Sequence, residues 1–312
     1  MNIKKVVVAG GGVLGSQIAY QSAFCGFDVT VWLRSEGSIE RAKPKFERLR
    51  NIYLNTLEAM KSDKSAYCRG FTDKADLSDE EIDALKEKAQ RAFDSLSLTT
   101  SYEEAADDAD LVIEAIAEDP NQKIPFYEEL AKHLPEKTIV VTNSSTLLPS
   151  QFAEYTGRPE KYLALHFANN IWAQNTGEVM GHPGTKQEYF DAIVQFAKDI
   201  NMVPLKVLKE QPGYILNSLL VPFLSAGQAL WANEVADPET IDLTWRLATG
   251  APNGPFQILD VVGLITAYNI VIMDPRSADP ETTQGKIALK LKEKIDAGET
   301  GINAGKGFYN YK

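Results

Sequence analysis

Two ionisable side chains lie close together in the stretch YLALHFANNIWAQNTGEVMG. His166 ends an apolar run that is typical of a buried strand, and Glu178 follows twelve residues later. We expect the segment between them to be an irregular loop that folds back and places the carboxylate against the imidazole. An imidazole held in this way can take a proton from a hydroxyl group, while the carboxylate fixes its tautomer and stabilises the imidazolium. The spacing therefore predicts an acid/base pair, and the alternative is a structural histidine.

Further polar side chains are expected near this pair. Asn169 follows His166 in the same stretch, and VVTNSSTL ends the preceding apolar run with Asn143, Ser144 and Ser145. The carboxyl ends of parallel strands meet at the ligand-binding edge of a doubly wound sheet. Asn217 lies in a largely apolar helix, where an asparagine needs a partner, and substrate is one candidate. The alternative for the serines is a role in turns or helix caps.

The stretch VVVAGGGVLGSQIA contains a glycine-rich turn between a predicted strand and a predicted helix. Gly10 would allow the tight turn, Gly12 the close approach of a pyrophosphate, and Gly15 the packing of helix on strand. Val13 and Leu14 begin the helix, whose N-terminus offers unpaired N–H groups to an anion. This pattern predicts a dinucleotide site, and the alternative is a purely structural turn.

The next strand, in DVTVWLRSEG, lacks the acidic residue that usually holds the adenosine ribose of NAD. Leu33, Arg34 and Ser35 stand there instead. Loss of the carboxylate removes its repulsion of the 2′-phosphate of NADP, and a guanidinium with a hydroxyl supplies donors for that phosphate. The sequence therefore favours NADP(H), with NAD(H) possible. Glu36 is an alternative ribose ligand, although it is better placed to cap the following segment.

Short apolar runs alternate with helix-length segments through the first two-thirds of the chain. The expected strands are Lys5–Ala9, Val29–Leu33, Leu111–Ile116, Thr138–Thr142, Tyr162–His166 and Val203–Leu208. They show little polar alternation, as expected when helices cover both faces of a parallel sheet. Ser78 and Ser101 each begin a capping box, and Pro120 suits a first helical turn. We predict an α/β fold with a Rossmann-type, doubly wound, mostly parallel sheet.

Residues 40–97 contain no convincing strand and predict a helical hairpin inserted after the second strand. Its Lys43, Lys45, Arg48 and Arg50 would either meet substrate phosphates or form a solvated face. From Glu210 to Gly250 the sequence favours helix throughout, with Asp237 and Pro238 as a cap and first helical residue. Two further helices are expected at Thr266–Met273 and Thr282–Ala297. The predicted domains are 1–208, which binds the dinucleotide, and 209–312, which is all-helical.

Composition limits the functional classes. The 312 residues carry a net charge of −11, which argues against a general nucleic-acid binder but not against a small anionic ligand. Two cysteines and three scattered histidines predict neither a disulfide framework nor a metal site. No apolar run approaches the ~18 residues of a membrane helix, and no signal peptide is recognisable. The expected setting is cytoplasmic.

Several motifs, in order, resemble the L-3-hydroxyacyl-CoA dehydrogenase family, including its 3-hydroxybutyryl-CoA members. DLVIEAIAEDPNQK is similar to D-L-V-x-E-A-I-x-E, HFANN to H-F-F-N-P, and QPGYILNSLLVPFL to P-G-F-I-x-N-R-L-L. TNSS, ATGAPNGPFQILD and GINAGKGFYNYK also match, so the resemblance covers essentially the whole chain. It implies an oxidoreductase in which His166 is catalytic, Glu178 orients it, and Ser145, Asn169 and Asn217 contact substrate.

The resemblance also implies that Glu118 lies beside the nicotinamide and that Lys123 reaches toward coenzyme A. It further implies a homodimer formed through the helical domain and a role in fatty acid metabolism. Two departures alter the substrate pocket: Ala168 and Asn170 replace Phe and Pro of H-F-F-N-P, and the segment IWAQNT is more polar than usual.

Three functional hypotheses follow. The first is the interconversion of an L-3-hydroxyacyl-CoA and a 3-oxoacyl-CoA with NADP(H) favoured. The second is the same chemistry on a small non-CoA 3-hydroxy or 3-oxo acid, as in relatives that act on carnitine, gulonate or diketo acids. The third is a catalytically silent cofactor-binding protein, like the lens relatives of this family, against which the intact His166 and Glu178 argue.

Overall fold

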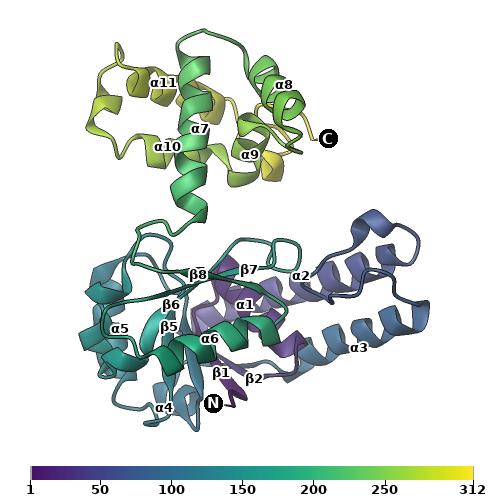
Figure 1. The fold of residues 1–312 in the computed structure, drawn as a ribbon, viewed down its shortest axis with the longest axis vertical. Coiled ribbons are helices and arrows are strands. Elements are labelled where there is room, and N and C mark those ends of the chain that lie inside the picture. The colour runs from purple at the N-terminus through teal and green to yellow at the C-terminus, as the bar shows by residue number, and fades with distance from the viewer. Residues whose placement is uncertain (1, 312) are drawn as a thin grey trace. The chain divides into compact units, whose positions relative to one another are not determined.

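The computed structural model describes residues 2–311, which form two compact units that meet between Ile215 and Leu216. We call these the first unit and the second unit (Figure 1). The last strand ends at Val207, close to the boundary that the sequence suggests, but the following eight residues still pack with the first unit. The turn that contains Tyr214 therefore belongs with the sheet.

The first unit is built on an eight-stranded sheet with the order β3-β2-β1-β4-β5-β6-β7-β8. Its strands are β1 Lys5–Ala9, β2 Asp28–Trp32, β3 Ser97–Thr99, β4 Leu111–Glu114, β5 Ile139–Thr142, β6 Tyr162–Phe167, β7 Thr176–Gly181 and β8 Val203–Val207. Its α-helices are α1 Val13–Phe24, α2 Glu36–Met60, α3 Asp79–Ser95, α4 Tyr102–Ala106, α5 Pro120–Leu130 and α6 Gln187–Asp199. All neighbouring strands are parallel except β6 and β7. The predicted fold class is confirmed.

The irregular loop expected between His166 and Glu178 is present but shorter than expected, over residues 168–175, and Glu178 itself lies in a strand. Strand β7 runs antiparallel to β6 and pairs with it over five residues, with Glu178 directly opposite His166. Glycines at both Gly177 and Gly181 hide this strand in the sequence, because glycine is depleted in strands. The three-residue strand β3 also went unpredicted. Its pairing with β2 places Thr99 beside Trp32 at the sheet edge.

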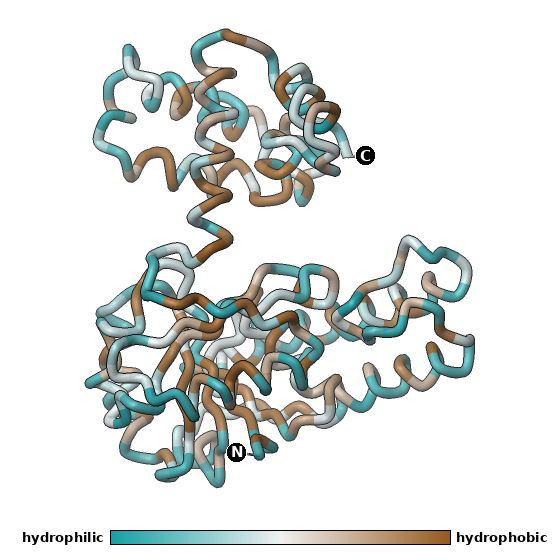
Figure 2. The backbone as a smooth tube through the Cα atoms, in the orientation of Figure 1, coloured by the Kyte–Doolittle hydropathy of each residue, from teal (hydrophilic) through white to brown (hydrophobic). Residues whose placement is uncertain are grey.

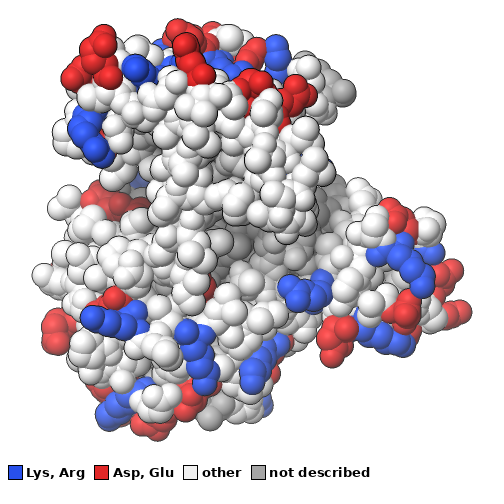
Figure 3. All heavy atoms as spheres, turned by 45° about the horizontal axis from the view of Figure 1, so that its top comes forward, with Lys and Arg blue, Asp and Glu red and all other residues white. Residues whose placement is uncertain are grey.

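Helices α2 and α3 form the inserted hairpin that the sequence predicts. Buried tyrosines fasten it to α1: the Tyr20 hydroxyl donates to the Ala89 carbonyl at 2.6 Å, and Tyr53 contacts the Tyr20 ring edge-on. Hydrophobic residues concentrate in the strands, whereas hydrophobic and hydrophilic residues alternate along both hairpin helices (Figure 2). Its outer charges of both signs intermix (Figure 3), with Lys61 and Asp83 paired at 2.7 Å. This part of the hairpin is a solvated face, while a phosphate-binding role of Lys43, Lys45, Arg48 and Arg50 remains a prediction.

The predicted helix starts at Ser78 and Pro120 are confirmed, and the one at Ser101 is confirmed in part. The Ser78 capping box is complete, and Pro120 begins α5 after the cap Asp119. The Ser101 box is only half formed: its hydroxyl accepts from the Glu104 amide, but the Glu104 carboxylate takes the Thr99 hydroxyl instead. A tertiary partner thus displaces the local one.

The second unit is helical, with α7 Leu216–Ala232, α8 Pro238–Thr249, α9 Pro255–Val262, α10 Leu264–Val271 and α11 Thr283–Asp296. Helix α9 was not anticipated. The buried Asp260 accepts hydrogen bonds from the backbone of Phe308 and Tyr309 and from the Tyr311 hydroxyl. A Cβ on Gly307 would lie 2.0 Å from Asp260 Oδ1. The motifs ATGAPNGPFQILD and GINAGKGFYNYK are therefore interlocking structural elements.

Among residues 2–311, no helix combines the length and the apolar character needed to cross a membrane.

Candidate active site

His166 and Glu178 form a buried pair across the β6–β7 ladder. His166 Nδ1 lies 2.9 Å from Glu178 Oε2, and both side chains are about 5% exposed or less. The second carboxylate oxygen accepts the Ile215 N–H at 2.9 Å. With Nδ1 turned to the carboxylate, Nε2 is the ring nitrogen left for chemistry. The geometry thus suits an oriented general acid or base.

Asn143, Ser144 and Ser145 follow β5 at the same carboxyl edge of the sheet, as the sequence predicts. The Asn143 side-chain oxygen accepts the Phe167 N–H at 3.1 Å, which joins the ends of β5 and β6. The Ser144 hydroxyl donates to the Glu118 carboxylate. The side chains of Asn143 and Ser144 therefore hold this segment in place. Ser145, the next residue, is half-buried.

Glu118 anchors the loop after β5. Its Oε1 accepts from the Ser144 and Thr146 hydroxyls and from the backbone N–H groups of Ser145, Thr146 and Leu147. Partial burial disfavours the charged form, but the hydrogen bonds from Ser144 and Thr146 and the charge of Lys123 outweigh it and lower the pKa of Glu118. An ionised Glu118 consequently holds the backbone around Ser145 in place.

Lys123, which the family resemblance directs toward coenzyme A, is buried and paired with carboxylates. Its side chain is 1% exposed, and Nζ is 2.6 Å from Glu114 Oε1 and 3.6 Å from Glu118 Oε2. The other Glu114 oxygen accepts from the Tyr127 and Thr142 hydroxyls, each at 2.7 Å. The buried Lys123 pairs with Glu114 and lies near Glu118, and its expected reach toward coenzyme A remains a prediction.

The loop after β6 carries Asn169, which is exposed. The next residue, Asn170, has a φ of +59°, and its N–H donates to the Gln17 carboxamide oxygen at 2.8 Å. The Ile171 N–H donates to the same oxygen at 3.3 Å. Because Gln17 lies on α1, the loop that follows His166 is fastened to the helix of the glycine turn. Asn217 is the second residue of α7 in the second unit, where its contact with substrate remains a prediction.

The glycine turn fits a dinucleotide pyrophosphate. Gly10 has a φ of +118°, and a Cβ there would lie 2.4 Å from the Ala115 carbonyl oxygen, so only glycine suits the turn. A Cβ on Gly15 would lie 2.2 Å from the Gly10 carbonyl oxygen. A Cβ on Gly12, the N-cap of α1, would meet nothing within 4 Å. Gly12 therefore leaves open space at a helix N-terminus, where a phosphate would sit; Val13 and Leu14 follow it in the first turn.

At the end of β2, Leu33 is buried, whereas Arg34 and Ser35 are exposed. Leu33 is 3% exposed and packs beneath Gly11, whose Cβ would lie 2.8 Å from Leu33 Cδ2. Arg34 is exposed and donates to Gln122 at 3.2 Å. Ser35 is the N-cap of α2, and its hydroxyl lies 3.0 Å from that of Ser38.

Arg41 and Glu36 also lie at the start of α2, close to Arg34 and Ser35. Arg41 donates to the Ser38 hydroxyl at 2.9 Å, which adds a second guanidinium that was not anticipated. Glu36 accepts the Thr100 hydroxyl at 3.3 Å and begins α2. Glu36 is therefore not the cap that the sequence suggested: Ser35 is the N-cap, and Glu36 is the first residue of the helix.

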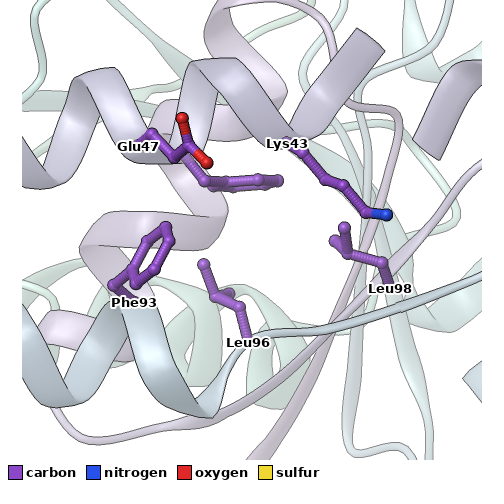
Figure 4. A pocket seen from close by; sticks show the side chains of 6 residues that line it. Lys43, Glu47, Phe93, Leu96 and Leu98 are labelled. Carbon is purple, nitrogen blue, oxygen red and sulfur yellow. The ribbon is translucent and has the colours of Figure 1, made fainter. Parts of the chain in front are cut away.

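The basic residues of the hairpin are largely occupied. Lys45 donates to the Gly11 carbonyl at 2.6 Å, Lys43 pairs with Glu40 at 2.7 Å, and Arg50 stacks on the Phe93 ring at 4.5 Å. Figure 4 shows a pocket of about 230 Å³ between α2, the end of α3 and β3, lined by Lys43, Phe46, Glu47, Phe93, Leu96 and Leu98. None of the acid/base or glycine-turn residues lines it.

Sequence reasoning missed Gln17, Arg41, Glu114 and Tyr214. Glu114 and Gln17 are polar residues within apolar segments, a signal that points to a buried hydrogen-bonded role. Arg41 lies one helical turn after Gly37, so its proximity to Ser38 follows once α2 is assigned. The Tyr214 ring stacks on the His166 imidazole, a contact with no signal in the sequence because the two residues are 48 positions apart.

Comparison with known proteins decides the family. Residues 5–211 match the model for the NAD-binding domain of 3-hydroxyacyl-CoA dehydrogenase, and residues 213–311 match the C-terminal domain. The chain belongs to the 3-hydroxyacyl-CoA dehydrogenase family. It is an oxidoreductase of that type, and the matched NAD-binding domain supports a nicotinamide cofactor.

Individual relatives cover nearly the full length. The chain is 31% identical to mitochondrial hydroxyacyl-coenzyme A dehydrogenase of Rattus norvegicus over 99% of this chain and 92% of that protein. It is 29% identical to 3-hydroxybutyryl-CoA dehydrogenase of Clostridioides difficile, over 98% and 99% of the two chains. Among solved structures, a diketoreductase described as acting on dicarbonyl compounds is 46% identical, with a TM-score of 0.84 over 100% of both chains.

Proposed function

We propose that this member of the family interconverts a 3-hydroxy and a 3-oxo group by means of the His166–Glu178 pair. The observation that carries the proposal is the 2.9 Å contact between Nδ1 and Oε2, which leaves Nε2 for the substrate oxygen. In oxidation, His166 takes the proton of the 3-hydroxyl; in reduction, it returns a proton to the 3-oxo oxygen. Glu178 keeps the tautomer and stabilises the imidazolium. A bound nicotinamide supplies the hydride acceptor or donor.

Other residues of this chain would bind and orient. Gly12 and the N-terminus of α1 would receive the pyrophosphate, because the space beside Gly12 is open and its neighbours are packed. Glu118 would lie beside the nicotinamide and hold the backbone of Ser145, which in turn would contact the substrate oxygen. Asn169 and Asn217 would supply further hydrogen bonds to substrate.

The cofactor we favour is NADP(H). Leu33 carries no charge to repel a 2′-phosphate, and Arg34, Ser35, Ser38 and Arg41 gather hydroxyl and guanidinium donors at the start of α2. NAD(H) is the competing cofactor, and a comparison of the dissociation constants of NADPH and NADH would decide between them.

Two substrate classes follow from the comparisons. An L-3-hydroxyacyl-CoA is supported by the family and by the names of the rat and clostridial relatives. A small non-CoA dicarbonyl or 3-hydroxy acid is supported by the 46% identity to the diketoreductase. The burial of Lys123 and its pairing with Glu114 also support this second class. Steady-state reduction of acetoacetyl-CoA, a free 3-oxo acid and a small dicarbonyl compound would separate them.

A homodimer formed through the second unit is part of this proposal. That unit exposes large apolar side chains, including Leu219 on α7 at 70%, Leu247 on α8 at 77% and Met273 just after α10 at 80%. Burying such residues against a second copy would remove them from water. Sedimentation equilibrium of the purified chain tests this association.

His166→Gln tests the function directly. We expect turnover of every substrate in the panel to be lost while cofactor binding, measured by fluorescence titration, is retained. Undiminished turnover would exclude His166 as the acid or base. Cofactor binding without turnover of any substrate by the unaltered protein would instead support the catalytically silent alternative.

A further inference from the structure

The ring of Tyr214 lies flat against the imidazole of His166. The two ring centroids are 4.6 Å apart, and the planes are inclined by 17°. Tyr214 is 1% exposed and packs with Ala164, Met180 and Val207. One face of the imidazole is thus covered by a rigid, buried side chain, while Nδ1 is held by Glu178.

The backbone at Tyr214 is in the left-handed region, with a φ of +53°. Gly213, which precedes it, has a φ of +79°, and the Tyr214 N–H closes the turn on the Gln211 carbonyl at 3.0 Å. A tyrosine is strained in this conformation, where a second glycine would be free. Strain of this kind persists only where the surroundings hold the residue in place, as the buried packing of the Tyr214 ring does here.

The same turn directs the next backbone N–H, that of Ile215, to the carboxylate of Glu178. Ile215 N–H donates to Glu178 Oε1 at 2.9 Å, so Glu178 is held from the His166 side by Oε2 and from the turn by Oε1. Tyr214 therefore acts on both members of the pair: its ring limits the imidazole, and its backbone conformation aims the N–H that fixes the carboxylate.

The phenol does not compete as a proton carrier. Burial raises the pKa of Tyr214, and the nearby carboxylates of Glu118 and Glu178 raise it further. The hydroxyl stays neutral throughout the range in which an imidazole titrates.

We propose that Tyr214 is a positioning residue of the acid/base site, which keeps the His166 ring in the plane from which Nε2 reaches the substrate oxygen. This inference rests on the proposed role of His166. It predicts that removing the ring slows the chemical step without weakening cofactor binding, since a small misplacement of a catalytic group lowers the rate strongly.

The experiment compares Tyr214→Phe, Tyr214→Gly and Tyr214→Asn in the full-length chain. Phe keeps the ring, whereas Gly and Asn tolerate the left-handed turn but lack the ring. For each variant, kcat and KM are measured with the best substrate of the panel, NADPH and NADH dissociation constants by fluorescence, and Tm by calorimetry. We expect Phe to match the unaltered protein, and Gly and Asn to lose kcat by about 10- to 100-fold with unchanged cofactor affinity.

Each outcome bears on the proposal. An unchanged kcat in Tyr214→Gly would overturn the proposal. A Tyr214→Phe variant as slow as Tyr214→Gly would also overturn it, because the aromatic ring would then not be what maintains the rate. If Tyr214→Gly does not fold, the Asn variant carries the same comparison. His166→Gln, measured alongside, separates the two levels: full activity in that variant defeats the proposed function itself, whereas an inactive His166→Gln with a fully active Tyr214→Gly defeats only this inference.

Discussion

The backbone N–H of Asn170 donates to the side-chain oxygen of Gln17 at 2.8 Å, with Asn170 at a φ of +59°. The contact fastens the loop after His166 to the helix of the glycine turn. Proline, the residue of the family motif at this position, has no N–H and cannot adopt a positive φ. The course of the loop beside the acid/base pair therefore depends on Asn170 and Gln17 together.

Gln17→Leu should destabilise the protein and raise the substrate KM. The change keeps the side-chain size but leaves the N–H groups of Asn170 and Ile171 without their acceptor, at a cost of about 1–3 kcal/mol. Urea unfolding and steady-state kinetics measure the two effects. The matched control is Gln195→Leu on α6, an exposed glutamine whose replacement should change neither. Equal stability of the two variants would contradict the role of Gln17.

Gly12→Ala should fold normally and lose cofactor affinity. Gly12 has a φ of −65°, which alanine adopts freely, and its Cβ would point into open space. We expect an unchanged Tm and at least about a tenfold rise in the cofactor dissociation constant, equal to 1.4 kcal/mol. Gly15→Ala is the contrasting variant: its Cβ would overlap the Gly10 carbonyl, which should cost about 1–3 kcal/mol of stability. Normal cofactor binding by Gly12→Ala would place the pyrophosphate elsewhere.

Arg34→Ala and Arg41→Ala should each weaken NADPH binding and leave NADH binding unchanged. A charge-assisted hydrogen bond contributes about 1.5–3 kcal/mol, so we expect a loss of about 10- to 100-fold for NADPH in fluorescence titrations. Arg91→Ala on α3, where the guanidinium pairs with Glu87 at 3.4 Å, is the control. An unaltered NADPH affinity in both variants would contradict the favoured cofactor.

Glu118→Gln should lower stability in a pH-dependent way. The pKa of Glu118 in the folded state lies below its ordinary value of 4.5, so its ionised form contributes stability above that pH. As the pH falls through the depressed folded-state pKa, the carboxylate is protonated and this contribution is lost. The difference in unfolding free energy between the unaltered protein and Glu118→Gln should therefore be largest at neutral pH and shrink in acid. A constant difference from pH 7 to pH 3 would show that the charge of Glu118 is not what stabilises the loop.

Much of the fold could be predicted because its signals are local. The glycine turn, most strand positions and the caps at Ser78 and Asp237 depend on residues only a few positions apart. The spacing of His166 and Glu178 likewise suggested a pair. Where prediction failed, the missing information was nonlocal: β7 is recognisable as a strand only through its pairing with β6, since its glycines do not favour one.

The sequence by itself determined which groups are available: an imidazole, a carboxylate, a glycine turn and a β2 end without an acid. Tertiary structure decided how they are used. Sheet register set Glu178 opposite His166, the packing of α5 turned Lys123 inward to Glu114, and the turn before α7 brought Tyr214 onto the imidazole. These outcomes depend on burial and on contacts between residues far apart in the chain. Residue types and spacing define the chemistry that is possible, but the energy of such contacts appears only when the chain is folded.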